Sequence, residues 1–411
     1  MKRSIDNELA INGGRPVRVD PFPPWPAYSE RQVDRATEVL RSGAVNYWTG
    51  SEGREFEKEF AAMCGARYAI AVANGTVSLE LGLEALGIGL GDEVIVTPRT
   101  FLASASSIVR RGAVPVFADV DRDSQNLTAD SIQSVLTPKT KGIMPVHLAG
   151  WPCNMEAICA LAKDNELGII EDCAQAVGAR HKGQHVGTFG EIGSFSFCQD
   201  KSMTTGGEGG MLVTNDEQLW SRLWSLKDHG KDFATVYPSK PPTSRHQFPW
   251  LHHSFGTNGR MTEMQSAIGR EQLMLLPSWT DIRRRHADRL AACFNQIDAL
   301  RTPLPDSDTL HSYYKCYTFV RPEKLEINWD RDAILSAINA EGIPCFSGSC
   351  SEVYLEKAFA GTEMPPPQRL PVARELGETS LMFLVHPTIT NADIEDTCAA
   401  VDKVFAAAQR R

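Results

Sequence analysis

The sequence lacks the features of membrane, secreted and metal-cluster proteins. No segment approaches the ~18 uncharged apolar residues that a membrane-spanning helix requires. The first residues, MKRSIDNELAINGG, contain no apolar stretch of the kind found in a secretory signal. The 10 cysteines include no CxxC pair, which argues against a zinc site and against a disulfide framework. These absences predict a cytoplasmic protein with reduced thiols and no metal site.

The charge balance and the length further limit the class of protein and its number of domains. A formal net charge of -9 argues against a general nucleic-acid-binding protein, although a local basic pocket could still attract a small anionic molecule. Hydrophobic residues form 42% and charged residues 23% of the chain, which is typical of folded globular proteins. Because 411 residues exceed the size at which one core stops growing, we expect a large domain and a smaller one.

Short apolar runs alternate with helical patterns through the first half of the chain. We expect strands at 68–73, 93–97, 114–120, 142–148, 168–171, 192–197 and 210–214, and a helix at 217–227. Apolar runs separated by helix-length segments are typical of a mostly parallel sheet with helices on both faces. Residues 20–255 are therefore predicted to form one doubly wound α/β domain.

The second half predicts a smaller α/β domain over residues 256–411, and residues 1–19 are expected to form an N-terminal arm. Residues 232–256, rich in proline, are predicted to be a long loop. Two helical stretches follow, at 261–275 and 278–297, and Pro277 is expected to break them apart. Further strands are expected at 313–320 and 381–385, with helices at 333–341 and 392–407.

Residues that could bind a ligand or take part in catalysis follow several predicted strands. They are expected at the sheet edge where α/β proteins bind ligands. Asn74-Gly75-Thr76 joins a strand to a helix, where free N–H groups and the helix dipole attract anions such as phosphate. From this segment alone, a tight turn with a capping threonine is the alternative. Phe101 follows another strand and could stack on a flat ligand; an ordinary core aromatic is the alternative.

Two ionisable residues complete the pattern. Asp172 closes the strand 168–171, and its carboxylate could hold a protonated ring nitrogen; a turn cap is the alternative. Lys201 follows another strand and precedes the glycine-rich segment 204–210, so its amine could form a Schiff base with an aldehyde. A solvated surface lysine is its alternative. Together these features indicate a planar, phosphorylated ring that carries an aldehyde.

The same motifs resemble those of the DegT/StrS-type sugar aminotransferases, which belong to the aspartate aminotransferase (fold type I) superfamily. The similarity covers nearly the whole chain and includes NYWTG at 46–50, NGT at 74–76, GIG at 87–89, GDEVI at 91–95, GAVPV at 112–116, PVHL at 145–148, EDCAQ at 171–175, SFS at 194–196 and GTNGRM at 256–261. The resemblance implies a large domain with a mostly parallel seven-stranded sheet flanked by helices, and a smaller C-terminal α/β domain.

The resemblance also implies site residues. Lys201 matches the lysine that forms the Schiff base, and Asp172 matches the residue that faces the pyridinium nitrogen; both are expected to be catalytic. The remaining cofactor contacts it implies are Gln175 at the ring hydroxyl, Phe101 on the ring face, Gly75, Thr76 and Ser196 at the phosphate, and Asn258 reaching the phosphate from a second subunit.

The family's substrate pocket begins at Thr49 and Gly50, so we expect these residues to lie near the substrate. The loop 232–256 carries several basic residues, among them His253, which could contact a diphosphate; a solvated loop is the alternative.

The implied function is a pyridoxal 5'-phosphate (PLP)-dependent aminotransferase with a ping-pong Schiff-base mechanism. L-Glutamate is the usual donor, and the acceptor is a keto group of a nucleotide-linked deoxy-sugar, as in polysaccharide or O-antigen biosynthesis. A cyclitol ketone or an antibiotic precursor is the alternative acceptor. The resemblance further implies a homodimer with shared active sites, and we expect no membrane or nucleic-acid partner.

Two other functions are alternatives for proteins with this resemblance. A sugar dehydratase of the same family would replace the Schiff-base lysine by histidine, whereas Lys201 is present and the cysteines show no iron–sulfur spacing. A non-catalytic sensor that keeps the fold would tend to lose Lys201 or Asp172, and both are intact. An absorption spectrum that an amino donor changes would separate the enzyme from the sensor.

Overall fold

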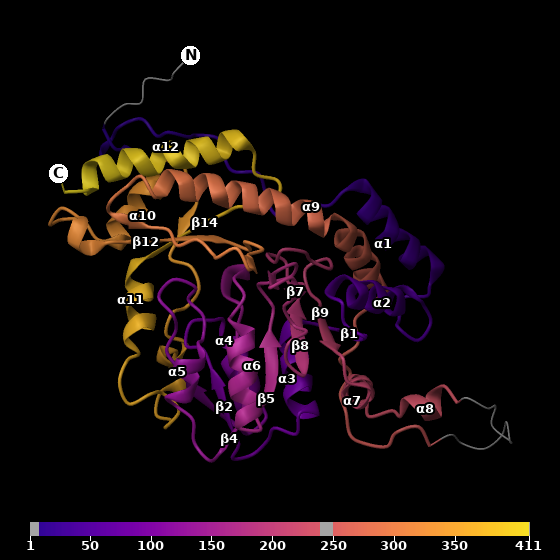
Figure 1. Cartoon of the computed structure of the whole chain (residues 1–411). Coiled ribbons are helices and arrows are strands. Elements are labelled where there is room, and N and C mark those ends of the chain that lie inside the picture. The colour runs from indigo at the N-terminus through magenta and orange to yellow at the C-terminus, as the bar shows by residue number, and fades with distance from the viewer. Residues whose placement is uncertain (1–7, 239–249, 411) are drawn as a thin grey trace.

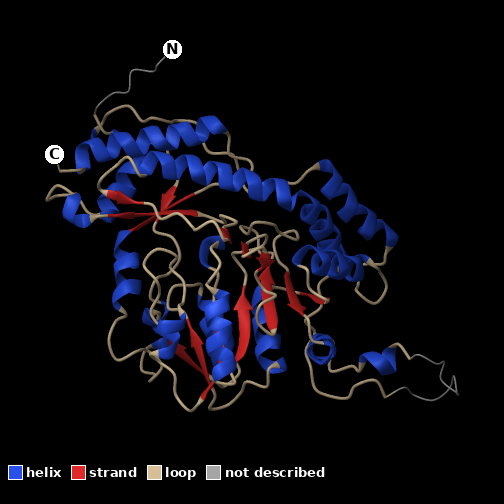
Figure 2. Ribbon diagram, in the orientation of Figure 1, coloured by secondary structure: helices blue, strands red, loops and turns tan. Residues whose placement is uncertain are grey.

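The computed structural model describes residues 8–238 and 250–410 and contains a large and a small sheet (Figures 1 and 2). The large sheet has seven strands in the order β1-β9-β8-β5-β4-β2-β3. All its strands are parallel except β9, which is antiparallel to both neighbours. Their bounds are β1 Tyr68–Val72, β2 Glu93–Val96, β3 Val114–Phe117, β4 Thr140–Met144, β5 Gly168–Asp172, β8 Ile192–Ser196 and β9 Gly210–Thr214. The predicted α/β class and mostly parallel sheet are confirmed.

Helices cover both faces of this sheet because the apolar side chains alternate along each strand. Val94 and Val96 point into one core layer and Ile95 into the other. Ile170 points into the first of these layers and Ile169 into the second. The first layer contains α3 Gly75–Ala85, α4 Leu102–Arg110 and α7 Glu217–Lys227; the opposite face is covered by α2 Glu52–Cys64, α5 Ala129–Gln133 and α6 Met155–Asp164.

The small sheet has four antiparallel strands in the order β10-β12-β14-β13. These are β10 Leu300–Arg301, β12 Cys316–Val320, β13 Cys345–Phe346 and β14 Ser380–Phe383. Its core is completed by α9 Glu263–Phe294, α10 Arg331–Ala340 and α12 Asn391–Ala408 (Figure 1). The expected smaller C-terminal sheet domain is therefore present, while the boundary placed at residue 256 stays a prediction.

Helix α9 corrects one expectation, because it continues through Pro277 as one helix of 32 residues. A proline inside a helix removes one hydrogen bond and crowds the preceding turn, at a cost of about 3 kcal/mol. Figure 1 shows why the helix persists: one end packs beside α1 Glu30–Ser42 and α2, and the other packs beside α12. Packing at both ends outweighs the local cost, and local sequence patterns do not report it.

Several elements were not anticipated. They include α1, the helix α11 Pro371–Thr379, and a three-stranded sheet of β6 Arg180–His181, β7 Gln184–His185 and β11 Thr309–Leu310. The predicted loop 232–256 contains the four-residue helix α8 Phe233–Val236, while residues 239–249 lie outside the described residues. Short 3-10 helices occur at Ala10–Asn12, Leu148–Gly150, Pro322–Lys324, Val353–Leu355 and Lys357–Phe359. Among the described helices, none combines the length and apolar character needed to cross a bilayer.

Candidate active site

A cavity of about 910 Å³ opens at the sheet edge where β1, β2, β5 and β8 end. Parallel strands bring their carboxyl ends to one edge, so residues far apart in the sequence meet there. The small domain closes the other side of the cavity, with residues before and within β12, and residues in and after both β13 and β14. Seven of the predicted site residues line this cavity: Gly75, Thr76, Phe101, Asp172, Gln175, Ser196 and Lys201.

The first turn of α3 forms one wall of the cavity. Asn74 caps this helix, and its side chain accepts a hydrogen bond from the N–H of Val77 at 2.9 Å. The N–H groups of a first helical turn have no acceptor within the helix, and they attract anions. A Cβ atom on Gly75 would lie 2.7 Å from the Cβ of Ser196, so only glycine allows this junction to approach β8. The geometry suits a phosphate at Gly75, Thr76 and Ser196.

Asp172 lies at the end of β5 with its carboxylate fixed. Ser104 donates a hydrogen bond to Oδ2 at 2.7 Å, and the N–H of Ala174 donates to Oδ1 at 3.0 Å. Thr100 lies 2.9 Å from the Ser104 hydroxyl and extends the network. Burial raises the pKa of Asp172, while the Ser104 and Ala174 hydrogen bonds oppose that increase. A cation brought beside this buried carboxylate would stabilise its ionised form.

Lys201 faces the same cavity from the segment after β8. Its ammonium lies 4.9 Å from the ring centroid of Tyr314 and 3.9 Å from the carboxylate of Asp200. The hydroxyl of Tyr314 donates to Asp200, which holds that carboxylate in place. The Trp25 indole N–H donates to the backbone carbonyl of Lys201 at 2.9 Å. The backbone is thus held, while the amine is not committed to a close ion pair.

Phe101 and Gln175 present the groups that a flat ring would need. The Phe101 side chain is 71% exposed although it lines the cavity, so one of its faces is available for stacking. Gln175 is buried, and its Oε1 accepts the N–H of Ala149 at 2.9 Å. Because the oxygen is occupied, the amide nitrogen is the group left to donate to a ligand oxygen.

Four predicted residues do not line the cavity of the single chain. Asn258 and His253 are exposed, and His253 faces Asp232 with a 3.8 Å separation between Nδ1 and Oδ1. Thr49 is also exposed and bonds to Asn46 in a turn, while Gly50 packs against Glu263. The basic residues Lys240, Arg245 and His246 of the same loop lie outside the described residues.

The structure adds residues that the sequence did not single out for a role. Ser104 holds Asp172 from α4, and Asp200 anchors Tyr314 beside Lys201. Lys315 and Tyr317 line the cavity from the small domain. Ser104 carried a weak signal, since it follows Phe101 in the helix that begins at the sheet edge. Lys315 and Tyr317 carried none, because only the packing of the two domains brings them to Lys201.

Comparison with known proteins identifies the family. A model of the DegT/DnrJ/EryC1/StrS aminotransferase family matches residues 26–402. The chain belongs to this family. Its PLP fold type I architecture is shared with an aminotransferase from Psychrobacter cryohalolentis, whose X-ray structure superposes with a TM-score of 0.92. That protein is 55% identical, and the match covers 94% of this chain and 99% of the other. This DegT-family chain is therefore an aminotransferase.

Two curated relatives differ in their named reactions. A GDP-perosamine synthase from Caulobacter vibrioides is 37% identical over 87% of this chain and 92% of its own length. A putative L-glutamine:3-amino-2,3-dideoxy-scyllo-inosose aminotransferase from Streptoalloteichus tenebrarius is 34% identical over 97% of this chain and 98% of its own. The family and the aminotransferase class are therefore shared, while donor and acceptor vary between relatives.

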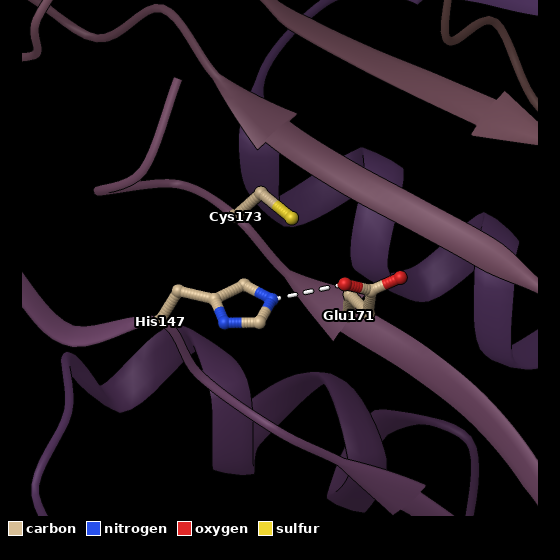
Figure 3. A group of neighbouring side chains, drawn as sticks. All are labelled: His147, Glu171 and Cys173. Carbon is tan, nitrogen blue, oxygen red and sulfur yellow. Dashed lines mark hydrogen bonds and ion pairs between the residues drawn. The ribbon is translucent and has the colours of Figure 1, made fainter. Parts of the chain in front are cut away.

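Glu171, the residue before Asp172 in this DegT-family chain, belongs to a buried polar network with His147 (Figure 3). Glu171 accepts backbone N–H bonds from Gly187 at 2.7 Å and from Phe189 and Gly190 at 2.8 Å each. Its Oε2 also lies 3.0 Å from Nε2 of His147. The carboxylate therefore fixes the segment between β7 and β8 to the end of β5, one residue before Asp172.

His147, Glu171 and Cys173 bring three potential metal ligands within 4.8 Å of one another (Figure 3). However, the N–H of Cys153 donates to Nδ1 of His147 at 3.0 Å, which assigns the ring proton to Nε2 and aims it at Glu171. Both ring nitrogens and both carboxylate oxygens are thus engaged by protein groups. This arrangement fits a structural support better than a metal site.

We expect Glu171→Gln to destabilise the protein by about 3 kcal/mol, because an amide cannot replace a buried carboxylate that accepts several N–H bonds. Thermal unfolding measures the loss as a lower midpoint. The matched control is Glu156→Gln, since Glu156 is exposed and pairs with Lys182 at the surface. Equal midpoints for the two variants would show that the network contributes nothing.

Proposed function

We propose that this DegT-family enzyme uses PLP bound through Lys201 to move an amino group from L-glutamate or L-glutamine to a keto group of a nucleotide-linked deoxy-sugar. The observation that carries the proposal is the presence of Lys201 and Asp172 in one cavity that also contains the first turn of α3. An amine, a buried carboxylate and an anion-binding helix end are the three groups that the aldehyde, ring nitrogen and phosphate of PLP require.

The residues present fit the cofactor on structural grounds. Gly75 closes against Ser196 so tightly that a side chain would be excluded, which leaves backbone N–H groups for a phosphate. Ser104 and Ala174 orient the Asp172 carboxylate, and the exposed face of Phe101 can cover a ring. When bound, PLP supplies an electron sink for the carbon that loses its proton.

Each catalytic residue then has a definite task. Lys201 would hold the cofactor through its Nζ, and its free amine would act as the base that moves a proton at the donor α-carbon. Asp172 would keep the ring nitrogen protonated. Gln175 would donate to the ring oxygen through its amide nitrogen. The small domain forms one side of the cavity and would limit the access of water to it.

The relatives support the choice of acceptor. GDP-perosamine synthase carries a nucleotide-linked sugar in its name, which favours the nucleotide-linked keto-sugar and a place in polysaccharide or O-antigen biosynthesis. The scyllo-inosose aminotransferase favours a cyclitol ketone as the second candidate, and its name also favours L-glutamine as donor. A sensor or a dehydratase is not proposed, because the chain is an aminotransferase by family.

We also propose that the enzyme is a cytoplasmic homodimer with shared active sites. Asn258, Thr49 and His253 lie on the surface of the single chain, and Phe255, which lies between His253 and Asn258 in the sequence, is 98% exposed. A second copy that covers this surface would bury an apolar side chain and bring Asn258 toward the phosphate of the neighbouring site. Sedimentation of the holoprotein as a dimer would support this assembly; a monomer with full turnover would contradict it.

The test of the proposed function is spectroscopic. The purified protein should bind PLP with a visible absorption band that L-glutamate or L-glutamine removes. A panel of nucleotide-linked keto-sugars and cyclitol ketones should then include one compound that restores the band. A protein that binds PLP but keeps its band with both donors would contradict amino transfer from these donors.

A further inference from the structure

A second lysine, Lys315, faces the cavity. It lies directly before β12 in the small domain and lines the same cavity as Lys201. Its ammonium lies 4.8 Å from the ring centroid of its neighbour Tyr314. Within residues 8–238 and 250–410, it makes neither a hydrogen bond nor an ion pair, and Asp200 interacts with it electrostatically only at longer range. A partly buried cation without a close ion pair is costly, so the site is suited to an anionic ligand.

Arg283 adds a third positive charge near Lys201 and Lys315. Arg283 of α9 is buried, and its Nη1 donates a hydrogen bond to the Tyr314 carbonyl at 3.4 Å. Its Nε and Nη2 have no hydrogen-bond partner among residues 8–238 and 250–410. Arg283 does not line the cavity itself, so it would act on a ligand through its charge. Asp200 is the nearby carboxylate, and Tyr314 already donates to it.

We propose that Lys315 binds the α-carboxylate of the amino-acid donor. This proposal rests on the proposed function, because it requires that an amino acid enters the cavity beside Lys201. It goes further because it assigns a role to a residue of the small domain. That role is to recognise the α-carboxylate, which L-glutamate and L-glutamine share. The bond is a charge-assisted hydrogen bond from Nζ to a carboxylate oxygen.

Geometry favours the donor over the phosphates of the acceptor. Lys201 and Lys315 lie at 4.9 Å and 4.8 Å from the centroid of the same Tyr314 ring and line one cavity, so their amines are within about 10 Å of each other and a small anion can reach both. An α-carboxylate is joined to the reacting carbon by one bond of about 1.5 Å. The diphosphate of a nucleotide-linked sugar is separated from its ketone carbon by part of the sugar ring.

The charge state of Lys315 is consistent with this role. Burial lowers the pKa of Lys315 to about 8, an effect that Asp200 opposes and that Arg283 and Lys201 reinforce. His386 also interacts with Lys315 electrostatically, and its own pKa is lowered to about 3, mainly by burial, so it adds no charge near neutral pH. Lys315 is therefore mainly protonated at pH 7, and a bound carboxylate would favour its charged form further.

The test compares Lys315→Met with Lys139→Met in the PLP-loaded protein. Methionine keeps the length of the side chain and removes the charge, and Lys139 is an exposed lysine outside the cavity. The probe is the α-methyl form of whichever donor removes the band of the unmodified enzyme. It carries the α-carboxylate but has no α-hydrogen to lose, so its dissociation constant can be measured at equilibrium. Lys315→Met should weaken its binding about 10- to 100-fold, the range expected for one charge-assisted hydrogen bond.

Three further measurements separate the possible outcomes. Lys315→Met should keep the PLP band and the KM for the acceptor, and Lys139→Met should resemble the unmodified enzyme throughout. Unchanged binding of the α-methyl donor overturns the proposal, as does a loss confined to the acceptor or to PLP, which would assign Lys315 to a phosphate. If neither donor removes the band of the unmodified enzyme, the proposed function fails instead.

Discussion

Lys201→Ala is expected to lower turnover by roughly 10,000-fold or more, because it removes both the covalent anchor of the cofactor and the base that moves the proton. The absorption band of bound PLP should also shift to that of the free aldehyde. The variant should fold normally, since the Lys201 side chain makes one weak ion pair and the Trp25 bond reaches its backbone carbonyl. Absorbance spectra and single-turnover rates measure both effects.

The matched control for this variant is Lys139→Ala, which changes an exposed lysine outside the cavity. Its spectrum, thermal midpoint and turnover should equal those of the unmodified enzyme. Residual turnover of Lys201→Ala within tenfold of the control would mean that another amine performs the chemistry.

Asp172→Asn is expected to lower turnover roughly 100- to 1,000-fold, because the amide cannot stabilise a positive ring nitrogen at the moment when charge enters the ring. The substitution keeps the size of the side chain; its amide oxygen can accept the bond from the Ala174 N–H, and its NH2 group can donate to the Ser104 hydroxyl. PLP should therefore remain bound through Lys201. The rate at which the donor removes the PLP band is the direct measurement.

Ser104→Ala is the companion to Asp172→Asn. It removes one hydrogen bond to the carboxylate but leaves the charge, so its loss in rate should be roughly tenfold or less. A ranking in which Ser104→Ala is as slow as Asp172→Asn would indicate that orientation of residue 172, and not its charge, limits the reaction. Rates for Asp172→Asn close to those of the unmodified enzyme would contradict its proposed role.

The large sheet could be predicted because its signals are local. Apolar residues cluster over four to five positions in β2 and β5, and β1, β2 and β9 are each followed by a helix. The continuity of α9 could not be predicted in this way. Pro277 is a strong local signal for a break, whereas the packing that overrides it comes from α1, α2 and α12, distant in the sequence.

The site residues also divide into those with a local sequence signal and those placed by packing between distant segments. Gly75, Asp172 and Lys201 follow strands of one parallel sheet, so their common edge could be inferred from the sequence. Lys315 could not be placed, because the sequence does not state how the small domain approaches that edge. Asn258 does not line the cavity of the single chain, so its proposed contact with the phosphate requires a second copy.

The most direct test of the account is to identify the lysine that carries the cofactor. Reduction of the PLP-loaded protein with borohydride makes the carbon–nitrogen link permanent, and peptide mass spectrometry then locates it. The account predicts the phosphopyridoxyl mass on Lys201 and on no other lysine of the cavity. Modification of Lys315, or of no residue in this cavity, would contradict it.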